Sequence, residues 1–198
     1  MIRKLLPIVA IALLLVACGP RQQAAEETAI ITQELLLDAN QQAFFNNLAS
    51  LCGQSFAGEE VYMVEGSESW SHLDFVMHVT VCENDRVHIP FHLSEDHSRT
   101  WMFLVEDGKL RFRHDHRHED GTPDEVTMYG GYATDQGTAF VQYFPADEYT
   151  CELIPYACTN EWTLILAEDF SKLTYRLTRG GVLRFEAAFD LTNPINAE

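Results

Sequence analysis

The chain has 198 residues, and its formal net charge at pH 7 is −17. So acidic a balance opposes binding to nucleic acid or to anionic lipid, because like charges repel. Hydrophobic residues make up 46% of the sequence and aromatic residues 11%, which is enough to bury one sizeable core. We therefore expect a single acidic globular domain with no nucleic-acid partner.

The first residues have the pattern of an export signal. Arg3 and Lys4 precede an apolar run from Leu5 to Val16. Roughly twelve apolar residues are too few to span a hydrocarbon core of about 30 Å, so the pattern predicts a signal peptide over residues 1–17 rather than a transmembrane helix. Removing this peptide would change the net charge from −17 to −19, because both charges lost are positive.

The end of this segment, LVAC at residues 15–18, resembles the bacterial lipobox. The resemblance implies cleavage before Cys18, diacylglycerol on its thiol, and a further acyl chain such as palmitate on the new N-terminus. Several acyl chains together anchor a protein stably to a membrane. Gly19 resembles the residue that follows the cysteine in lipoproteins passed on to the outer membrane. We expect a bacterial envelope lipoprotein facing the periplasm, with residues 18–27 as a flexible tether; a plain secretory signal is the alternative.

Four further cysteines are present, and an even number in an exported protein indicates disulfides. Four cysteines allow three pairings. We favour Cys52 with Cys82, which would tie a helix end to a strand end, and Cys151 with Cys158, which would close a short loop. The absence of a C-x-x-C motif argues against thioredoxin-like redox chemistry.

The predicted domain covers residues 28–198 and begins with one amphipathic helix over residues 28–52. Its apolar residues recur at helical spacing: Leu37, Phe44, Leu48 and Leu51. Thr28 can cap the start of this helix, and Gly53 can end it. The apolar face of the helix needs a partner, which the rest of the chain can supply.

Residues 55–191 change to a period of two, which is typical of half-buried strands, and we expect about ten of them. The pattern buries the odd-numbered residues of 73–81 and 87–93 and turns His78, His88 and His92 away from the core. Short strands, tight turns and no βαβ alternation predict a mainly β fold, an antiparallel meander closed into a barrel. A β-sandwich is the alternative. The strand count and meander order resemble the calycin-like barrels, the group of the lipocalins, although LCGQSFAGE (51–59) lacks their Gly-x-Trp motif.

Four sequence stretches resemble a family of uncharacterised bacterial secreted proteins and lipoproteins. They are SRTW (98–101), HDHRHEDGTPDEVTMYGG (114–131), TNEW (159–162) and FDLT (189–192). They lie across most of the mature chain, so the resemblance implies a single domain. The family has no established activity, and the resemblance implies no mechanism.

Two turns set the expected strand registers. Asp107-Gly108 is a strong two-residue hairpin signal. It places Phe103 opposite Phe112, Trp101 opposite His114, and Arg99 opposite His116. At Gly180-Gly181 we expect a three-residue turn or a bulge, because a strict two-residue turn would set apolar residues opposite polar ones. Gly130-Gly131 interrupts a strand and predicts a bulge or a bend that closes the barrel.

The first hairpin suggests a ligand pocket near the barrel mouth. Its candidate ligand-binding residues are Arg99, Trp101, His114 and His116. A cation beside an aromatic wall suits a small amphiphilic or anionic molecule. Two alternatives assign no ligand to these residues. In one, Arg99 forms a solvated ion pair with Asp115 or Glu119. In the other, His114 is a partly buried core residue, and His116 and His118 form a solvated strand end.

Alternate spacing also places His114, His116 and His118 on one side of a strand, where two imidazoles can reach one zinc ion. A third ligand would come from a neighbouring strand or an acidic loop, and His118 completes the three-histidine set. Zinc is the only cofactor suggested. We find no G-x-S-x-G, S-x-x-K or phosphate-loop motif, so no catalytic residue is assigned and a binding protein is favoured over an enzyme. A structural envelope module without a ligand is the second hypothesis, and a metal-binding protein or metal-dependent enzyme is the third.

Overall fold

The computed structural model describes residues 37–196. The predicted signal peptide, Cys18, the tether and the Thr28 cap lie outside these residues. Neither of the described α-helices is long and apolar enough to cross a bilayer.

The helix α2 spans Ala39–Ala49 and is shorter than expected. Asp38 is its N-cap: the backbone there is extended, and the carboxylate accepts hydrogen bonds from the N–H groups of Asn40 and Gln41. A capping aspartate satisfies N–H groups that have no partner within a helix, so it marks a helix start. The prediction of one continuous helix over residues 28–52 is therefore wrong. Apolar spacing continues across Asp38 and hides this boundary.

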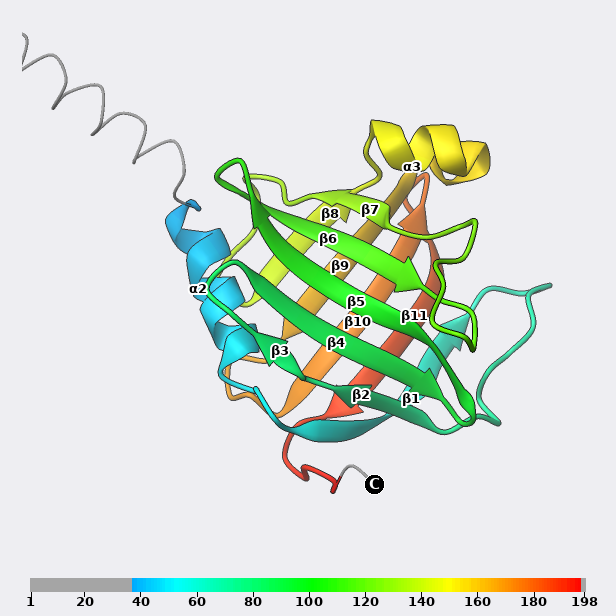
Figure 1. The fold of residues 1–198 in the computed structure, drawn as a ribbon, viewed down its shortest axis with the longest axis horizontal. Helices are drawn as coiled ribbons and strands as arrows, with labels where there is room; N and C mark the ends of the chain where they lie inside the picture. Colours follow the sequence, from blue (N-terminus) through cyan, green and yellow to red (C-terminus); the bar gives the residue numbers. More distant parts are fainter. Residues whose placement is uncertain (1–36, 197–198) are drawn as a thin grey trace, which may run out of the picture. The chain divides into compact units, whose positions relative to one another are not determined.

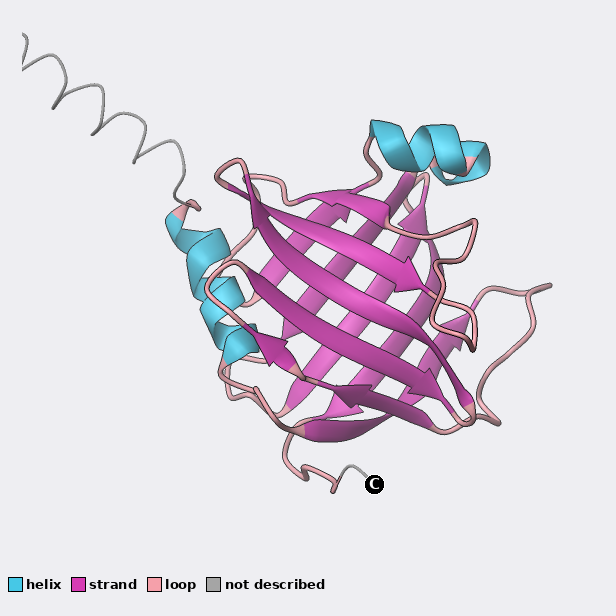
Figure 2. Ribbon diagram, in the orientation of Figure 1, coloured by secondary structure: helices cyan, strands magenta, loops and turns pink. Residues whose placement is uncertain are grey.

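Antiparallel strands form one curled sheet, a nearly closed barrel, so the sandwich alternative is wrong (Figure 2). Along the sheet the order is β7-β6-β5-β4-β2-β1-β11-β10-β9-β8, with β3 paired to β4. The strands are β1 Ser55–Met63, β2 Phe75–His78, β3 Val81–Cys82, β4 Arg86–Leu93, β5 Asp96–Glu106, β6 Lys109–His116, β7 Tyr129–Tyr132, β8 Val141–Pro145, β9 Asn160–Leu166, β10 Lys172–Arg179 and β11 Val182–Asp190. A short helix, α3 (Glu148–Leu153), and a 3-10 turn (Pro155–Ala157) join β8 to β9.

The barrel closes where β7 meets the segment after β8. The Asp147 N–H donates to the Gly130 carbonyl oxygen at 3.0 Å. Gly130 has φ +151°, and a Cβ atom at Gly131 would collide with the Pro145 carbonyl oxygen. The register of β7 against β6 is regular through both glycines. The glycine pair therefore lies where the barrel closes, as predicted, and it does so by close approach of two backbones and without a bulge.

The registers predicted from the turns are confirmed. In the β5–β6 hairpin, Phe103 pairs with Phe112, and the Trp101–His114 and Arg99–His116 pairs follow in the same register. In the β10–β11 hairpin, a bulge after Leu177 restores its pairing with Phe185. Local turn chemistry and the alternation of apolar residues are sufficient to determine both hairpins.

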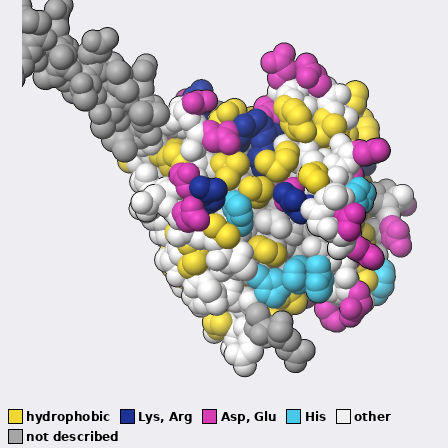
Figure 3. Space-filling view, viewed as in Figure 1, with side chains coloured by type: hydrophobic (Ala, Val, Ile, Leu, Met, Phe, Trp, Pro, Cys, Tyr) yellow, Lys and Arg dark blue, Asp and Glu magenta, His cyan; other side chains and the backbone are white. Residues whose placement is uncertain are grey.

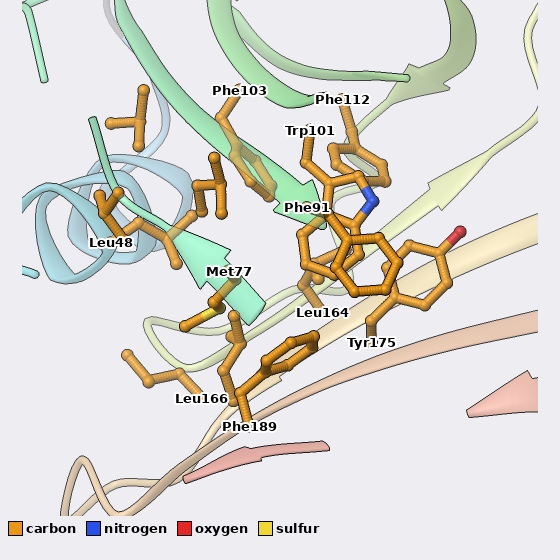
Figure 4. Close-up of a cluster of buried hydrophobic side chains, with 14 of the residues drawn as sticks. Leu48, Met77, Phe91, Trp101, Phe103, Phe112, Leu164, Leu166, Tyr175 and Phe189 are labelled. Carbon is orange, nitrogen blue, oxygen red and sulfur yellow. The ribbon is translucent and has the colours of Figure 1, made fainter. Parts of the chain in front are cut away.

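The helix α2 covers one end of the barrel (Figure 1). Phe44 and Leu48 are fully buried, and the Phe44 ring centroid lies 6.2 Å from that of Phe103. The Gln41 side-chain oxygen accepts a hydrogen bond from the Leu110 N–H at 2.9 Å, which ties the helix to β6. Leu48 points from the helix into the packed core beneath it (Figure 4). This end of the barrel is filled by side chains.

Both predicted disulfides are present. Cys52 pairs with Cys82 and joins the segment after α2 to β3. Cys151 pairs with Cys158 and closes a loop that contains the end of α3.

Candidate functional site

A pocket occupies the barrel end opposite α2. Its volume is about 630 Å³, within the usual range for small-molecule sites. It lies where β6 and β10 end and β9 and β11 begin (Figure 1). The pocket is therefore the unfilled half of a barrel whose other half is packed core.

All four residues of the predicted ligand site line this pocket: Arg99, Trp101, His114 and His116. The hairpin register accounts for this convergence, because it sets the four side chains on the inner face of β5 and β6. Their role in binding a ligand stays a prediction.

Aromatic residues from distant strands complete the floor. The Trp101 ring stacks on that of Tyr175, with centroids 4.8 Å apart and an interplanar angle of 7°. It also stacks on Phe91 at 4.7 Å, as the close-up view shows (Figure 4). Trp162 lines the same space from β9. Tyr175 and Trp162 fall within the alternating residues 55–191, but no sequence signal tells which strands face each other across the barrel.

Trp70 forms one side of the mouth from the loop between β1 and β2. Its ring lies edge-on to Phe185, with centroids 5.3 Å apart, and the Arg99 guanidinium lies 5.6 Å from it. The Glu60 carboxylate accepts a hydrogen bond from the Trp70 backbone N–H and another from the Ser69 hydroxyl, which fixes the loop to β1. The loop has no periodic pattern, and sequence reasoning therefore missed Trp70.

His114 is buried at the floor with both ring nitrogens engaged. Its Nδ1 lies 3.2 Å from the Tyr129 carbonyl oxygen, and its Nε2 lies 2.9 Å from the Tyr175 hydroxyl. Burial lowers the pKa of His114 to about 3, so the ring is neutral near pH 7. A carbonyl oxygen can only accept, so Nδ1 carries the proton and Nε2 accepts from the Tyr175 hydroxyl. The tautomer is thus determined by its partners.

His116 makes a second histidine–tyrosine contact. Its Nε2 lies 2.9 Å from the Tyr129 hydroxyl. Burial, and then the positive charge of Arg99, lowers the pKa of His116, while burial raises the pKa of Tyr129 to about 12. The floor is therefore polar at a few points and carries no charge near neutral pH.

Arg99 pairs with Asp96 on its own strand, so the alternatives of Asp115 and Glu119 are wrong. Burial acts to raise the pKa of Asp96, but hydrogen bonds from Ser98 and Arg99 outweigh it and lower the pKa to about 2. Asp115 instead accepts from Arg117 at 2.7 Å. Strand geometry explains the difference, because Asp115 projects from the outer face of β6 and Arg99 from the inner face of β5.

Two further arginines line the mouth, and sequence reasoning missed both. Arg179 donates from Nε to the Asn160 side-chain oxygen at 2.7 Å, and its guanidinium lies 4.9 Å from the Tyr156 ring. Within residues 37–196, neither Arg179 nor Arg184 forms an ion pair. Three arginines and a single carboxylate, that of Glu68, line the pocket. This mouth is locally basic on a chain whose net charge is −17.

The predicted three-histidine zinc site is not assembled. His118 lies beyond the end of β6 and is exposed, whereas both nitrogens of His114 are already hydrogen-bonded. In the described part of the chain, no group of three or more His, Cys, Asp or Glu side chains is arranged to hold a metal ion. The structure favours the two-histidine pocket over the strand-end metal site.

Comparisons with known proteins add little. No family model matches the sequence. No curated protein matches it either. Among solved structures, a redesigned β-barrel matches 72% of this chain and 93% of its own, with a TM-score of 0.30 and 10% sequence identity. The resemblance to uncharacterised secreted proteins and lipoproteins stays a prediction.

Proposed function

We propose that this protein is a lipid-anchored component of the bacterial cell envelope that binds a small amphiphilic anion in the open end of its barrel. The observation that carries the proposal is the pocket of about 630 Å³, in which three arginines surround an aromatic floor. The uncharged floor accepts an apolar group. At the mouth, Arg179 and Arg184, which form no ion pair within residues 37–196, accept a carboxylate, sulfate or phosphate. No chemical step is assigned to the site.

The anchor is the second part of the proposal. Cys18 lies outside the described residues, and the LVAC sequence supports its acylation. The protein would contact the membrane only through this anchor, at the periplasmic face of the outer membrane. The acidic balance of the chain argues against nucleic acid as a partner.

The competing function is that of a structural envelope module without a ligand. In such a module, large side chains would fill the whole barrel interior. Phe103, Phe112 and Phe189 do fill the half beneath α2 and are fully buried, but Phe185 borders the open pocket. A packed half beside an open, aromatic half favours ligand binding.

Intrinsic fluorescence tests the binding proposal, because all three tryptophans of the chain, Trp70, Trp101 and Trp162, line the pocket. The full-length chain in phosphatidylcholine vesicles would be titrated with octanoate and with 1-octanol, which has the same chain length and no charge. We expect a saturable change in tryptophan emission and an affinity at least fivefold higher for octanoate. Equal affinities would remove the anionic part of the proposal, and no saturable change with either probe would contradict binding of small amphiphiles.

Incorporation of labelled palmitate tests the anchor. Cells expressing the full-length chain should label it, and Cys18→Ser should abolish the label. The mass of the mature protein should correspond to a chain that begins at Cys18 and carries acyl groups. Cleavage elsewhere, or a label that survives Cys18→Ser, would contradict the lipoprotein assignment without affecting the fluorescence result.

A further inference from the structure

Three histidines form a contiguous row on the outer surface of the barrel, separate from the pocket. They are His78 on β2, His92 on β4 and His97 on β5, and histidine side chains gather on this face in Figure 3. His78 Nε2 lies 3.1 Å from His92 Nδ1, and the rings of His92 and His97 stack with centroids 3.8 Å apart. The alternation of apolar residues predicts this outer face for His78 and His92.

The spacing of the first two rings is close to that of metal ligands. In a tetrahedral zinc site with Zn–N bonds of about 2.0–2.1 Å, two ligand nitrogens lie roughly 3.3–3.4 Å apart. The gap of 3.1 Å between His78 Nε2 and His92 Nδ1 needs to widen only slightly. An ion between the two nitrogens would replace the hydrogen bond that now joins them.

The far side of the His78 ring already has a partner. Its Nδ1 lies 2.8 Å from the Ser55 hydroxyl oxygen, and Ser55 is buried. A ligating imidazole commonly donates its other N–H to such a group, which fixes the ring and its tautomer. Ser55 would accept from Nδ1 and leave Nε2 free of its proton for a metal.

The histidines also have the protonation state that metals require. Burial, followed by the neighbouring His97 and His78, lowers the pKa of His92 to about 4, and burial also lowers the pKa of His78. Both rings are therefore neutral over the range where zinc binds proteins. The net negative charge of the chain favours the approach of a cation.

We propose that His78 and His92 form a two-imidazole chelate for a borderline divalent transition-metal ion of the zinc class. No three side chains within residues 37–196 are already arranged as a metal site, so a third protein ligand has to turn toward the ion. We assign this ligand to His97, whose exposed ring stacks on that of His92. Water completes the coordination. This site is independent of the pocket and of its proposed ligand.

Calorimetric titration of the full-length chain with zinc chloride in phosphatidylcholine vesicles tests the proposal. We expect one zinc ion per chain, and His92→Gln should weaken binding at least tenfold. His88→Gln is the matched control, because His88 lies on the same strand and face, four residues before His92, and its Nε2 forms no hydrogen bond. Absence of zinc binding, or equal weakening by both variants, would overturn the proposal.

A measurement on the unaltered chain covers the case in which His92→Gln does not fold. Nuclear magnetic resonance of the imidazole groups should show zinc-dependent shifts at His78, His92 and His97. Shifts confined to His114, His116 or His118 would overturn the proposed site and move the metal to the pocket side. Octanoate binding should be unchanged by zinc, so failure of either proposal can be recognised separately.

Discussion

The Tyr175 hydroxyl donates a hydrogen bond of 2.9 Å to Nε2 of His114, although the two residues are 61 positions apart in the sequence. The bond crosses the barrel interior from β10 to β6. Burial raises the pKa of Tyr175 well above its usual value and lowers that of His114, so both groups stay neutral. This neutral pair forms the polar centre of the pocket floor and connects the two sides of the barrel.

Tyr175→Phe should destabilise the fold. The substitution removes the hydroxyl and leaves His114 Nε2 buried without a donor, which costs about 1–3 kcal/mol. The free energy of unfolding, obtained from urea titration followed by circular dichroism, measures the loss. Tyr156→Phe is the control, because that side chain is 71% exposed and should change nothing measurable. Equal stability of the two variants would show that the bond contributes little.

Acid should weaken the fold through His114. The folded-state pKa is about 3 and the usual value is 6.5, so below pH 6.5 the unfolded chain binds a proton that the folded chain does not. The stability due to neutral His114 is therefore complete above pH 6.5 and decreases as the pH falls toward 3. The slope for one such group is about 1.4 kcal/mol per pH unit.

Urea unfolding between pH 8 and pH 4.5 measures this dependence. Other histidines with lowered pKa values, such as His92, add to the slope. The contribution of His114 is therefore the difference between the pH slopes of the unaltered chain and of His114→Gln. Identical slopes for the two proteins would contradict the assignment of a buried neutral imidazole.

The local parts of this fold can be predicted from sequence, and the parts that depend on closure cannot. The Asp107-Gly108 turn and strand alternation are short-range signals, and they place Arg99 opposite His116. Whether Tyr175 meets Trp101 depends on how a whole sheet curls, which no neighbouring residue encodes. The start of α2 was missed for a different reason, since a capping side chain at Asp38 overrides a continuing apolar pattern.

Arg184→Gln should weaken binding of anions at the pocket mouth. An exposed ion pair between the arginine and the carboxylate is worth at most about 1 kcal/mol. The octanoate affinity should therefore fall by up to about fivefold, while that of 1-octanol stays unchanged. Raising the sodium chloride concentration to about 1 M should lower the octanoate affinity of the unaltered chain toward that of the variant, because salt screens exposed charges. Tryptophan emission follows both titrations.

Lys172→Gln removes one positive charge from β10 away from this pocket and serves as the control for net charge. It should leave octanoate binding unchanged. A loss equal to that of Arg184→Gln would mean that the overall charge, rather than the mouth, attracts the anion.

Removing the Cys52–Cys82 disulfide should destabilise the fold more than removing Cys151–Cys158. The first bond closes a loop with a sequence separation of 30 and the second a loop with a separation of 7. A disulfide restricts the unfolded chain more when it closes a longer loop. The free energy of unfolding should therefore fall by about 4 kcal/mol without Cys52–Cys82 and by about 2 kcal/mol without Cys151–Cys158. Urea unfolding of the two double Cys→Ser variants measures both values. The first bond also holds the segment after α2 against β3 at the closed end, so its loss should leave octanoate affinity at the open end intact. A larger loss for the shorter loop would show that native contacts around α3, rather than chain entropy, determine the contribution of each bond.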